Sequence, residues 1–240
     1  MQMRLDKLLA STGRWSRREV KELVRRGRVL VDGAAPKSAE EKVEGESAHI
    51  RVDGEEILYR EFTYIMLHKP AGVLCATDDA RQETVVDLLP RELQRRGLFP
   101  VGRLDKDTEG LLLLTNDGAL AHALLAPKKH VDKVYYARTD GTLTKSDCDA
   151  FAQGMVLADG LQCLPAELTI LRAGETSEAL VTLREGKFHQ VKRMLAARGN
   201  TVTYLKRLQM GTLRLDESLD AGAYRALTEE EVENLRRSCV

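Results

Sequence analysis

Hydrophobic residues near the start of the chain recur every three or four positions in two short segments. The first segment places leucines on one helical face and ends at Gly13. The second opens with a capping box, in which the Ser16 hydroxyl and the Glu19 carboxylate bind free backbone N–H groups at a helix start. Its apolar stripe ends before Gly27, a typical C-terminal cap. The pattern therefore predicts two short helices, whose buried residues are Leu5, Leu8, Leu9, Val20, Leu23 and Val24.

Short apolar runs that end in Asp-Gly pairs follow the two helices. Val29–Val31 precedes Asp32-Gly33, and residues 50–52 precede a second Asp-Gly pair. An Asp-Gly pair between short strands is typical of a tight hairpin turn. We interpret the two occurrences as recurring hairpins rather than as a solenoid repeat. Residues 1–60 are thus predicted to form a small N-terminal domain of helices and hairpins.

Beyond Phe62 the pattern changes to longer, mixed helices and strands. Strands are predicted at residues 64–67, 111–115, 168–171 and 180–183, and helices at residues 120–125, at residues 191–195 and after a capping box at residues 228–231. These elements are interspersed without a regular βαβ order. We therefore expect an α+β fold, in which a mixed, mainly antiparallel sheet with flanking helices occupies residues 61–240.

The composition fits two domains without a membrane segment. The 240 residues are 43% apolar, which is enough for a core, and the apolar runs are far shorter than the ~20 residues of a membrane helix. The first residues carry charges where a signal peptide needs an apolar stretch, so we expect a soluble, cytoplasmic protein. The cysteines lack the spacing of a zinc ribbon, a disulfide scaffold or a redox pair, and are Cys75, Cys148, Cys163 and Cys239.

Charge is balanced overall but unevenly distributed. The 37 Lys and Arg equal the 37 Asp and Glu, yet residues 1–37 hold ten cations against four acids and residues 184–207 hold seven against one. We interpret residues 38–60, with seven acids against three cations, as an acidic connector. A single charged helix face is more often simply solvated, but the density of arginines and the two separate cationic clusters favour nucleic acid, a long anionic partner. The cations that fall off the apolar stripe of the second helix are Arg17, Arg18, Lys21, Arg25 and Arg28.

A polar loop between two glycines, residues 102–110, leads directly into the predicted strand at residues 111–115. This loop would hold the Asp105 carboxylate at the rim of a rigid sheet, a position that active sites favour. Asp107 is the competing carboxylate, for which we expect a turn or capping hydrogen bond. An ordinary acidic turn explains the same residues equally well. A hydrolase with Asp105 and Asp107 as a carboxylate pair is a further alternative, but it gives no reason for two separate cationic clusters.

Two other segments carry candidate contacts. Tyr135 and Tyr136 are adjacent in a predicted strand, so they face opposite sides of it. At most one of them can stack on a base, and core packing is the default for the other. His189 is a candidate general base, but a single His beside Gln190 is more often a hydrogen-bonded structural residue.

Taken together, these motifs resemble those of the RsuA-type ribosomal pseudouridine synthases, over nearly the whole chain. Residues 4–33 resemble an S4 RNA-binding module. Residues 67–72 are similar to the family's entry strand, except that His68 stands where the family usually has Asn. Residues 102–111 match the catalytic motif, residues 133–135 the tyrosine motif and residues 185–194 the third motif. The third motif and the lack of a long basic C-terminal tail are most similar to the small-subunit (16S) branch.

The resemblance implies isomerisation of uridine to pseudouridine in ribosomal RNA without a metal or other cofactor. Asp105 would attack the nucleoside so that the base rotates and rejoins through carbon, Tyr135 would stack on the base and help remove a proton, and Lys192 would pair with Asp105. Arg103 would fill the gap that the flipped base leaves. The expected partner is 16S rRNA, free or in an assembling small subunit, bound by a monomer away from any membrane. The residues expected to bind RNA are Arg103, Arg17, Arg18, Lys21, Arg25, Arg28, Lys187, His189, Gln190 and Arg193.

These roles agree with the energetics of a closed pocket. An isolated Asp ionises near pH 3.9, burial raises its pKa by ~3–5 units, and a nearby cation lowers it by ~1–3 units. Lys192 would therefore keep Asp105 charged and oriented. Flipping the base costs on the order of a few kcal/mol, of which stacking on Tyr135 returns ~1–3 kcal/mol. A 23S rRNA enzyme of the same family and a non-catalytic S4-type RNA-binding or ribosome-assembly protein remain alternatives.

Overall fold

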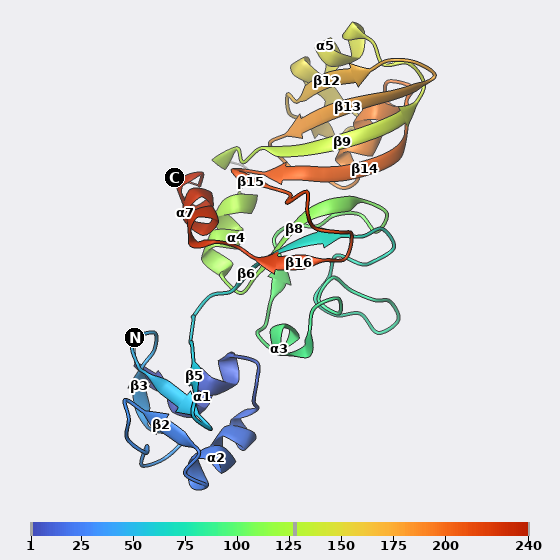
Figure 1. Ribbon diagram of the computed structural model, residues 1–240. Helices are drawn as coiled ribbons and strands as arrows, with labels where there is room; N and C mark the ends of the chain where they lie inside the picture. Colours follow the sequence, from blue (N-terminus) through green and yellow to red (C-terminus); the bar gives the residue numbers. More distant parts are fainter. Residues whose placement is uncertain (1, 127–128, 240) are drawn as a thin grey trace.

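The computed structural model describes residues 2–126 and 129–239, which form a small N-terminal domain and a larger domain around one nine-stranded sheet (Figure 1). Residues 58–63 connect the last strand of the first domain to the first strand of the second. We propose residue 60 as the boundary between them. No helix in the described part of the chain combines the length and the apolar character needed to cross a lipid bilayer.

The N-terminal domain packs two helices and two small sheets around one apolar core. The capping box is present, because the Ser16 hydroxyl accepts a hydrogen bond from the Glu19 N–H at 3.2 Å and the Glu19 carboxylate accepts one from the Ser16 N–H at 2.6 Å. Asp53, with a φ of 53°, and the following glycine join two strands in a hairpin. The elements are β1 (Gln2–Arg4), α1 (Leu5–Ser11), α2 (Arg17–Arg25), β2 (Val29–Val31), β3 (Lys42–Glu44), β4 (Ile50–Val52) and β5 (Glu55–Ile57).

The acidic stretch of residues 38–60 is not a connector, and this part of the sequence interpretation is wrong. It supplies β3, β4 and β5, whose inward side chains complete the apolar core. Its outward acids pair with the basic segment that precedes it in sequence: Asp53 with Arg28 at 2.5 Å and Glu55 with Arg14 at 2.6 Å. The charge contrast therefore reflects two halves of one small domain. Residues 50–52 were expected to form a strand, whereas β3 and β5 were not, because two of the three residues in each carry exposed polar side chains.

The larger domain is built on a mixed sheet, as expected. Its strands run in the order β12 (Glu167–Arg172), β13 (Thr176–Leu183), β9 (Lys133–Asp140), β14 (Thr201–Met210), β8 (Glu109–Thr115), β6 (Tyr64–Lys69) and β16 (Tyr224–Ala226). The short strands β7 (Phe99–Pro100) and β15 (Leu213–Arg214) extend β8 and β14, and β10 (Met155–Val156) pairs with β11 (Gln162–Cys163) separately. All neighbours are antiparallel except β14 and β8.

Two apolar cores lie on opposite faces of this sheet. One face carries α5 (Lys145–Gln153), α6 (Gln190–Ala196) and the segment around α3 (Arg91–Gln94), and the other carries α4 (Gly118–Leu125) and α7 (Glu229–Arg237). Along β8, Leu112 and Leu114 enter the first core whereas Leu111 and Leu113 enter the second. A strand covered on both faces reads as a continuous apolar run, which explains the uninterrupted leucines here.

The two domains meet closely at Gly13. A Cβ atom there would lie 1.9 Å from the carbonyl oxygen of Glu92 in α3, so only glycine fits. Arg96 adds a hydrogen bond from its guanidinium to the Ser11 carbonyl oxygen at 3.3 Å. The contact joins the loop between α1 and α2 to the segment that covers one face of the large sheet.

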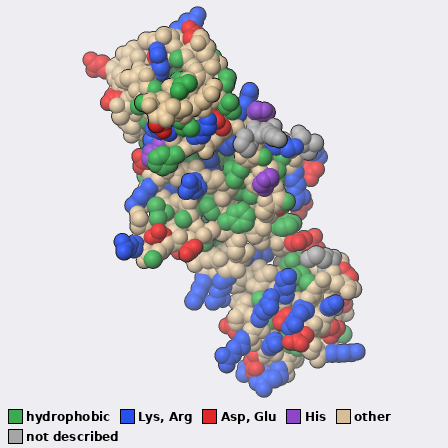
Figure 2. Space-filling model, turned by 180° about the vertical axis from the view of Figure 1, so that it is seen from behind, with side chains coloured by type: hydrophobic (Ala, Val, Ile, Leu, Met, Phe, Trp, Pro, Cys, Tyr) green, Lys and Arg blue, Asp and Glu red, His purple; other side chains and the backbone are tan. Residues whose placement is uncertain are grey.

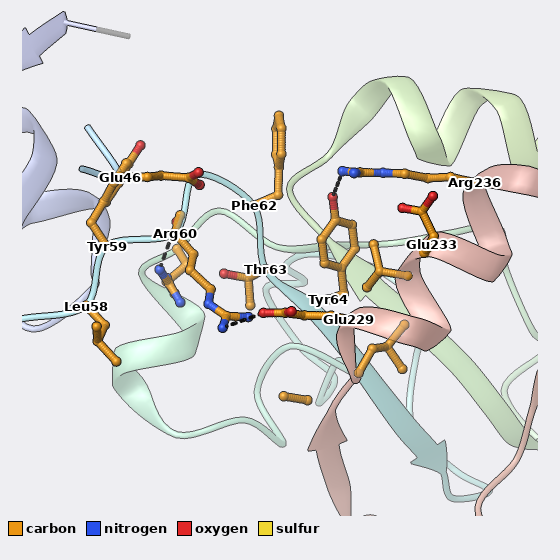
Figure 3. Close-up of a pocket in the computed structure, with 14 residues that line it drawn as sticks. Glu46, Leu58, Tyr59, Arg60, Phe62, Thr63, Tyr64, Glu229, Glu233 and Arg236 are labelled. Atoms are coloured by element: carbon orange, nitrogen blue, oxygen red, sulfur yellow. Dashed lines mark hydrogen bonds and ion pairs between the residues drawn. The ribbon is translucent and has the colours of Figure 1, made fainter. Parts of the chain in front are cut away.

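A cavity of about 600 Å³ lies beside this contact, between the connecting residues and α7 (Figure 3). Arg60 pairs across it with Glu229 at 3.0 Å, and Arg236 donates to the Tyr64 hydroxyl at 2.8 Å. Burial, together with the hydrogen bond to Asp117, raises the pKa of Tyr64 to about 12. The cavity is therefore a polar junction between domains and shares none of its lining residues with the pocket around Asp105.

Candidate active site

Three segments that are distant in sequence form one pocket around two of the predicted catalytic residues, Asp105 and Tyr135. Asp105 comes from the loop before β8 and Tyr135 from β9, and the loop before α6 and the first turn of α6 supply Gly186, Lys187, His189, Gln190 and Val191. The pocket has a volume of about 70 Å³ and adjoins a cavity of about 780 Å³ that Asp105 also lines. The side chain of Asp105 is 24% exposed, so a ligand in the pocket can reach its carboxylate.

Lys69 binds the backbone of the loop that carries Asp105. The ammonium group of this fully buried lysine donates to the carbonyl oxygens of Pro70, Lys106 and Thr108 at 2.9, 3.1 and 3.0 Å. Burial lowers the pKa of Lys69. Because three carbonyls converge on one donor group at the end of β6, the loop that presents Asp105 is anchored to the sheet.

Lys192 lies between the two carboxylates of the loop. Its ammonium group is 3.3 Å from Asp105 Oδ2 and 2.5 Å from Asp107 Oδ1. The hydrogen bond from Lys192 lowers the pKa of the Asp107 carboxyl. His189 Nε2 lies 3.5 Å from the other oxygen of Asp105. The predicted pairing of Lys192 with Asp105 is present, but Asp107, for which we expected only a turn or capping role, holds the lysine more closely.

The two adjacent tyrosines face opposite sides of β9, as the alternation predicts. Tyr135 is buried and lines the pocket with Asp105. Tyr136 lies on the other face, where its ring meets that of Tyr204 at 6.1 Å in an edge-to-face arrangement. Only Tyr135 is therefore placed to contact a base near Asp105.

The loop before α6 is fixed by an internal hydrogen-bond network. The Gln190 side chain is buried, and its amide donates to Glu185 Oε1 at 2.6 Å and accepts from the Lys187 N–H at 3.0 Å. The Lys187 ammonium group pairs with Glu185 at 3.0 Å and donates to the Gln162 carbonyl oxygen. Gln190 thus holds the loop in place instead of presenting its amide to the surface, which changes the role that the sequence suggested for it.

The remaining cations expected to bind RNA are distributed over both domains. Arg103 is exposed at the mouth of the pocket, whereas Arg193 pairs with Asp159 at 2.5 Å. Figure 2 shows Lys and Arg side chains gathered on the N-terminal domain, with acids among them. Arg17 and Arg18 are exposed there and make no ion pair with any described residue; Lys21, Arg25 and Arg28 each pair with an acid. Exposed pairs contribute little stability, so these cations can exchange an acid for a phosphate.

Two residues of the site were missed by the sequence reasoning. Lys133 is buried in the wall of the larger cavity, where its ammonium group donates to the Val131 carbonyl oxygen at 3.0 Å and makes no ion pair with the described residues. Burial lowers the pKa of Lys133. Phe188 is 70% exposed at the edge of the same cavity. Lys133 could have been identified from the sequence, because it lies in the tyrosine motif just before Tyr135. Phe188 could not, because no sequence pattern indicates that an aromatic ring is exposed.

The arrangement combines a reachable carboxylate, a cation beside it, and an aromatic ring in one concave site. Among residues 2–126 and 129–239, no group of His, Cys, Asp and Glu side chains is arranged to hold a metal ion. The chemistry that this set of side chains supports is nucleophilic attack by a carboxylate on a planar substrate that stacks on a tyrosine. A carboxylate-pair hydrolase fits less well, because Asp107 is committed to Lys192.

Comparison with known families accounts for both domains. Residues 3–48 match the S4 domain, and residues 63–197 match the RNA pseudouridylate synthase family. A solved structure described as a pseudouridylate synthase is 36% identical, with a TM-score of 0.68 over 97% of this chain and 99% of that one. The chain belongs to the RNA pseudouridylate synthase family, in the RsuA-type group that carries an S4 domain before the catalytic domain.

Curated relatives match this chain over almost their full lengths. The chain is 50% identical to the uncharacterized RNA pseudouridine synthase YtzG of Bacillus subtilis (strain 168), over 96% of this chain and 97% of that protein. It is 40% identical to ribosomal small subunit pseudouridine synthase A of Vibrio cholerae (97% and 99%) and 39% identical to ribosomal large subunit pseudouridine synthase B of Bacillus subtilis (97% and 95%). The protein is therefore an isomerase that forms pseudouridine, which confirms the predicted class of enzyme.

Proposed function

We propose that the protein converts a specific uridine of ribosomal RNA to pseudouridine, in 16S rRNA of the small subunit, with Asp105 as the nucleophile. The observation that carries this proposal is that Asp105 and Tyr135 line one pocket while the Lys192 ammonium group lies 3.3 Å from Asp105. The reaction breaks the N1–C1′ bond of the nucleoside and forms a C5–C1′ bond, while C5 loses a proton and N1 gains one. Because the atoms balance within the nucleoside, no cofactor is required.

In this proposal Asp105 forms the covalent bond that frees the base to rotate. Lys192, at 3.3 Å, keeps the carboxylate charged and directs it into the pocket. Tyr135 stacks on the flipped base and assists the removal of its proton. Attack on the sugar and attack on the pyrimidine both use the same carboxylate and the same neighbours. His189, 3.5 Å from Asp105, is a contact to RNA rather than the general base.

The RNA is held from two sides by a single copy of the chain. Arg103 and Lys133 lie at the cavity beside Asp105, and Lys133 has no acid paired with it in the described structure. Exposed cations of α2, including Arg17 and Arg18, supply sequence-tolerant contacts to phosphates. Binding energy from these remote contacts offsets the cost of extruding the uridine.

The assignment to 16S rRNA is supported by relatives named for the small subunit that match nearly the whole chain. A relative named for the large subunit matches to a similar extent, so 23S rRNA is the second candidate. Mapping every pseudouridine in both rRNAs, from cells with and without the gene, separates the two. Loss of one site in 16S rRNA is expected, and loss of a site only in 23S rRNA would reassign the substrate.

An assay with purified protein tests whether naked RNA or an assembling subunit is the substrate. Purified protein is added to 16S transcripts and to small-subunit particles from the deletion cells, and pseudouridine is measured at the missing site. We expect pseudouridine at this site in the naked transcript. Modification of the particle alone would show that ribosomal proteins form part of the substrate.

A further inference from the structure

Arg207 is a buried cation without a negatively charged partner, close to the catalytic pocket. It is 2% exposed and forms no ion pair with any residue in the described ranges. Its Nε donates to the Leu111 carbonyl oxygen at 2.8 Å, whereas Nη2 is buried and has no hydrogen-bond partner among the described residues. Burying a charge without a partner is unfavourable, so a cation of this kind is a candidate for a functional role.

The strand pairing places Arg207 on the catalytic face of the sheet. In the antiparallel pair of β9 and β14 (Figure 1), Arg207 lies directly opposite Tyr135, and residues paired in this way point to the same face. Leu205, two positions earlier on β14, shares that face because side chains alternate along a strand. Tyr135 and Leu205 both line the pocket that contains Asp105, and Arg207 does not. Arg207 therefore lies behind the wall that these two side chains form.

The other buried cations in the described part of the chain, Lys69 and Lys133, also lie near the pocket. Lys69 binds the backbone of the loop that carries Asp105, and Lys133 lines the adjoining cavity. Burial lowers the pKa of both lysines, and the positive charge of Arg207 lowers that of Lys133 further. A lysine reduces the cost of burial by releasing its proton, whereas a guanidinium stays charged. Arg207 is therefore the permanent charge of this group.

Cys75 does not neutralise the charge of Arg207, although it lies within reach of that charge and lines the same cavity as Asp105. Burial raises the pKa of its thiol, which therefore stays uncharged. The Asp105 carboxylate has a cation of its own, since the Lys192 ammonium group lies 3.3 Å away. An excess positive charge is thus fixed behind the pocket before any substrate binds.

The proposed reaction produces negative charge on the substrate in this pocket. If Asp105 attacks the sugar, the electron pair of the N1–C1′ bond leaves with the base. If it attacks the pyrimidine at C6, the π electron pair of the C5–C6 bond moves into the ring. In both cases the charge returns to the carboxylate when C5 has bonded to C1′ and the bond to Asp105 breaks, while a proton moves from C5 to N1. The ring is therefore anionic only during the rearrangement.

We propose that Arg207 is a positioning residue, whose fixed charge stabilises the anionic ring across the wall formed by Tyr135 and Leu205. It does not touch the substrate. A charge that is already in place in a site of low dielectric constant lowers the energy of a developing anion without any reorganisation. The uracil ring is neutral when it binds, so this charge acts on the rate rather than on RNA affinity. The proposal rests on the proposed function in one respect, namely that the target uridine reaches Asp105.

An anchoring role is the alternative, because Arg207 also donates to the backbone of β8 at Leu111. Three variants separate the two roles: Arg207→Lys keeps the charge, Arg207→Gln keeps an uncharged hydrogen-bond donor, and Arg207→Met keeps neither. Removing a buried charge that lacks a partner relieves an unfavourable burial. The urea midpoint of Arg207→Gln should therefore equal or exceed that of Arg207→Lys. The rates of reaction should rank in the opposite order, with Arg207→Lys the faster.

Rates are measured in single turnover, as release of tritium from uridine labelled at C5. The substrates are ribosomal particles from cells that lack the gene and the RNA extracted from them, so the target is present whichever rRNA carries it. At about pH 6.5, where an introduced ammonium group stays protonated, we expect Arg207→Gln and Arg207→Met to lower the rate about 10- to 100-fold. Arg207→Lys should lower it less than about tenfold. Affinity for the RNA, measured by filter binding, should stay within about threefold of wild type.

Thr139→Val is the matched control. It removes another buried polar atom that has no hydrogen-bond partner in the described ranges, from the face of β9 that carries Tyr135. Its rate should stay within about twofold of wild type. Rates that follow the urea midpoints, with Arg207→Gln as fast as Arg207→Lys, would overturn the electrostatic role and leave the proposed function intact. No release of tritium by wild-type enzyme from either substrate would overturn the proposed function and this role with it.

Discussion

The ammonium group of Lys192 lies 2.5 Å from Asp107 and 3.3 Å from Asp105. The two carboxylates differ in exposure, since the Asp107 side chain is 73% exposed and that of Asp105 is 24% exposed. The exposed carboxylate therefore holds the lysine, and the sheltered one remains free to react. In the proposed mechanism this shared cation orients Asp105, the proposed nucleophile, without binding it as closely as Asp107.

Removing Asp107 should leave the enzyme active, because Lys192 can then move to Asp105. We expect Asp107→Asn to keep the rate of pseudouridine formation within about threefold of wild type. Lys192→Met should lower the rate about 10- to 100-fold, the effect of losing one charge-assisted hydrogen bond. Initial rates on the same rRNA fragment measure both. If Asp107→Asn were as inactive as a variant of Asp105, Asp107 would be the essential carboxylate.

Lys69 should matter for stability and for activity together. In Lys69→Met, three buried carbonyl oxygens lose their donor, so the free energy of unfolding should fall by about 2–4 kcal/mol. The rate should fall as well, because the same carbonyls anchor the loop that carries Asp105. Urea unfolding and initial rates measure the two effects. Lys145→Met, at an exposed lysine of α5, is the control, and an equal effect there would contradict the anchoring role.

Gly110 is required where β8 runs beside β14. Its φ is 103°, and a Cβ atom would lie 2.2 Å from the Arg207 carbonyl oxygen and 2.7 Å from the Arg207 nitrogen. Backbone atoms cannot move aside locally, so Gly110→Ala should destabilise the protein by about 3 kcal/mol or more. Gly118, in the first turn of α4, has open space around it. Gly118→Ala should be neutral or stabilise by up to about 1 kcal/mol in the same unfolding assay. Equal effects would be inconsistent with the steric account.

Asp216 should make stability depend on pH in the acid range. Hydrogen bonds from Ser218 and Arg225 lower the pKa of its carboxyl from an ordinary value of 3.8 to about 2. Because the folded-state value is the lower one, its stabilising contribution is complete above about pH 4 and is lost as pH falls towards 2. Thermal midpoints of wild type and Asp216→Asn should converge over this interval. A difference between them that stays constant from pH 5 to pH 2 would argue against the linkage.

The sequence predicted those features that depend on local chemistry. The capping boxes at Ser16 and at Thr228 form as expected, because a cap involves residues only three positions apart. The separation of Tyr135 from Tyr136 follows from strand alternation alone. The sequence predicted a mixed sheet but did not predict its longest strand, β14. This strand contains two bulges, which interrupt the alternation of side chains between the two faces of the sheet.

Features that depend on tertiary geometry could not be predicted. Helix α5 was missed because few of its residues are buried, with Phe151 the one fully buried apolar side chain among them. The preference of Lys192 for Asp107 is a difference of under 1 Å between residues far apart in the chain. The exposed ring of Phe188 has no periodicity to mark it. The proposed catalytic residues were selected through motif resemblance, because a carboxylate in a polar loop is by itself compatible with an ordinary turn.

The most direct test of the account is the amount of pseudouridine that Asp105→Asn forms at the mapped uridine under single-turnover conditions. Wild-type enzyme and Asp107→Asn serve as controls, and filter binding to the same RNA confirms that the variant still binds. We predict no pseudouridine above background with RNA affinity unchanged. Pseudouridine formation by Asp105→Asn within tenfold of the wild-type rate would contradict the assignment of Asp105 as the nucleophile.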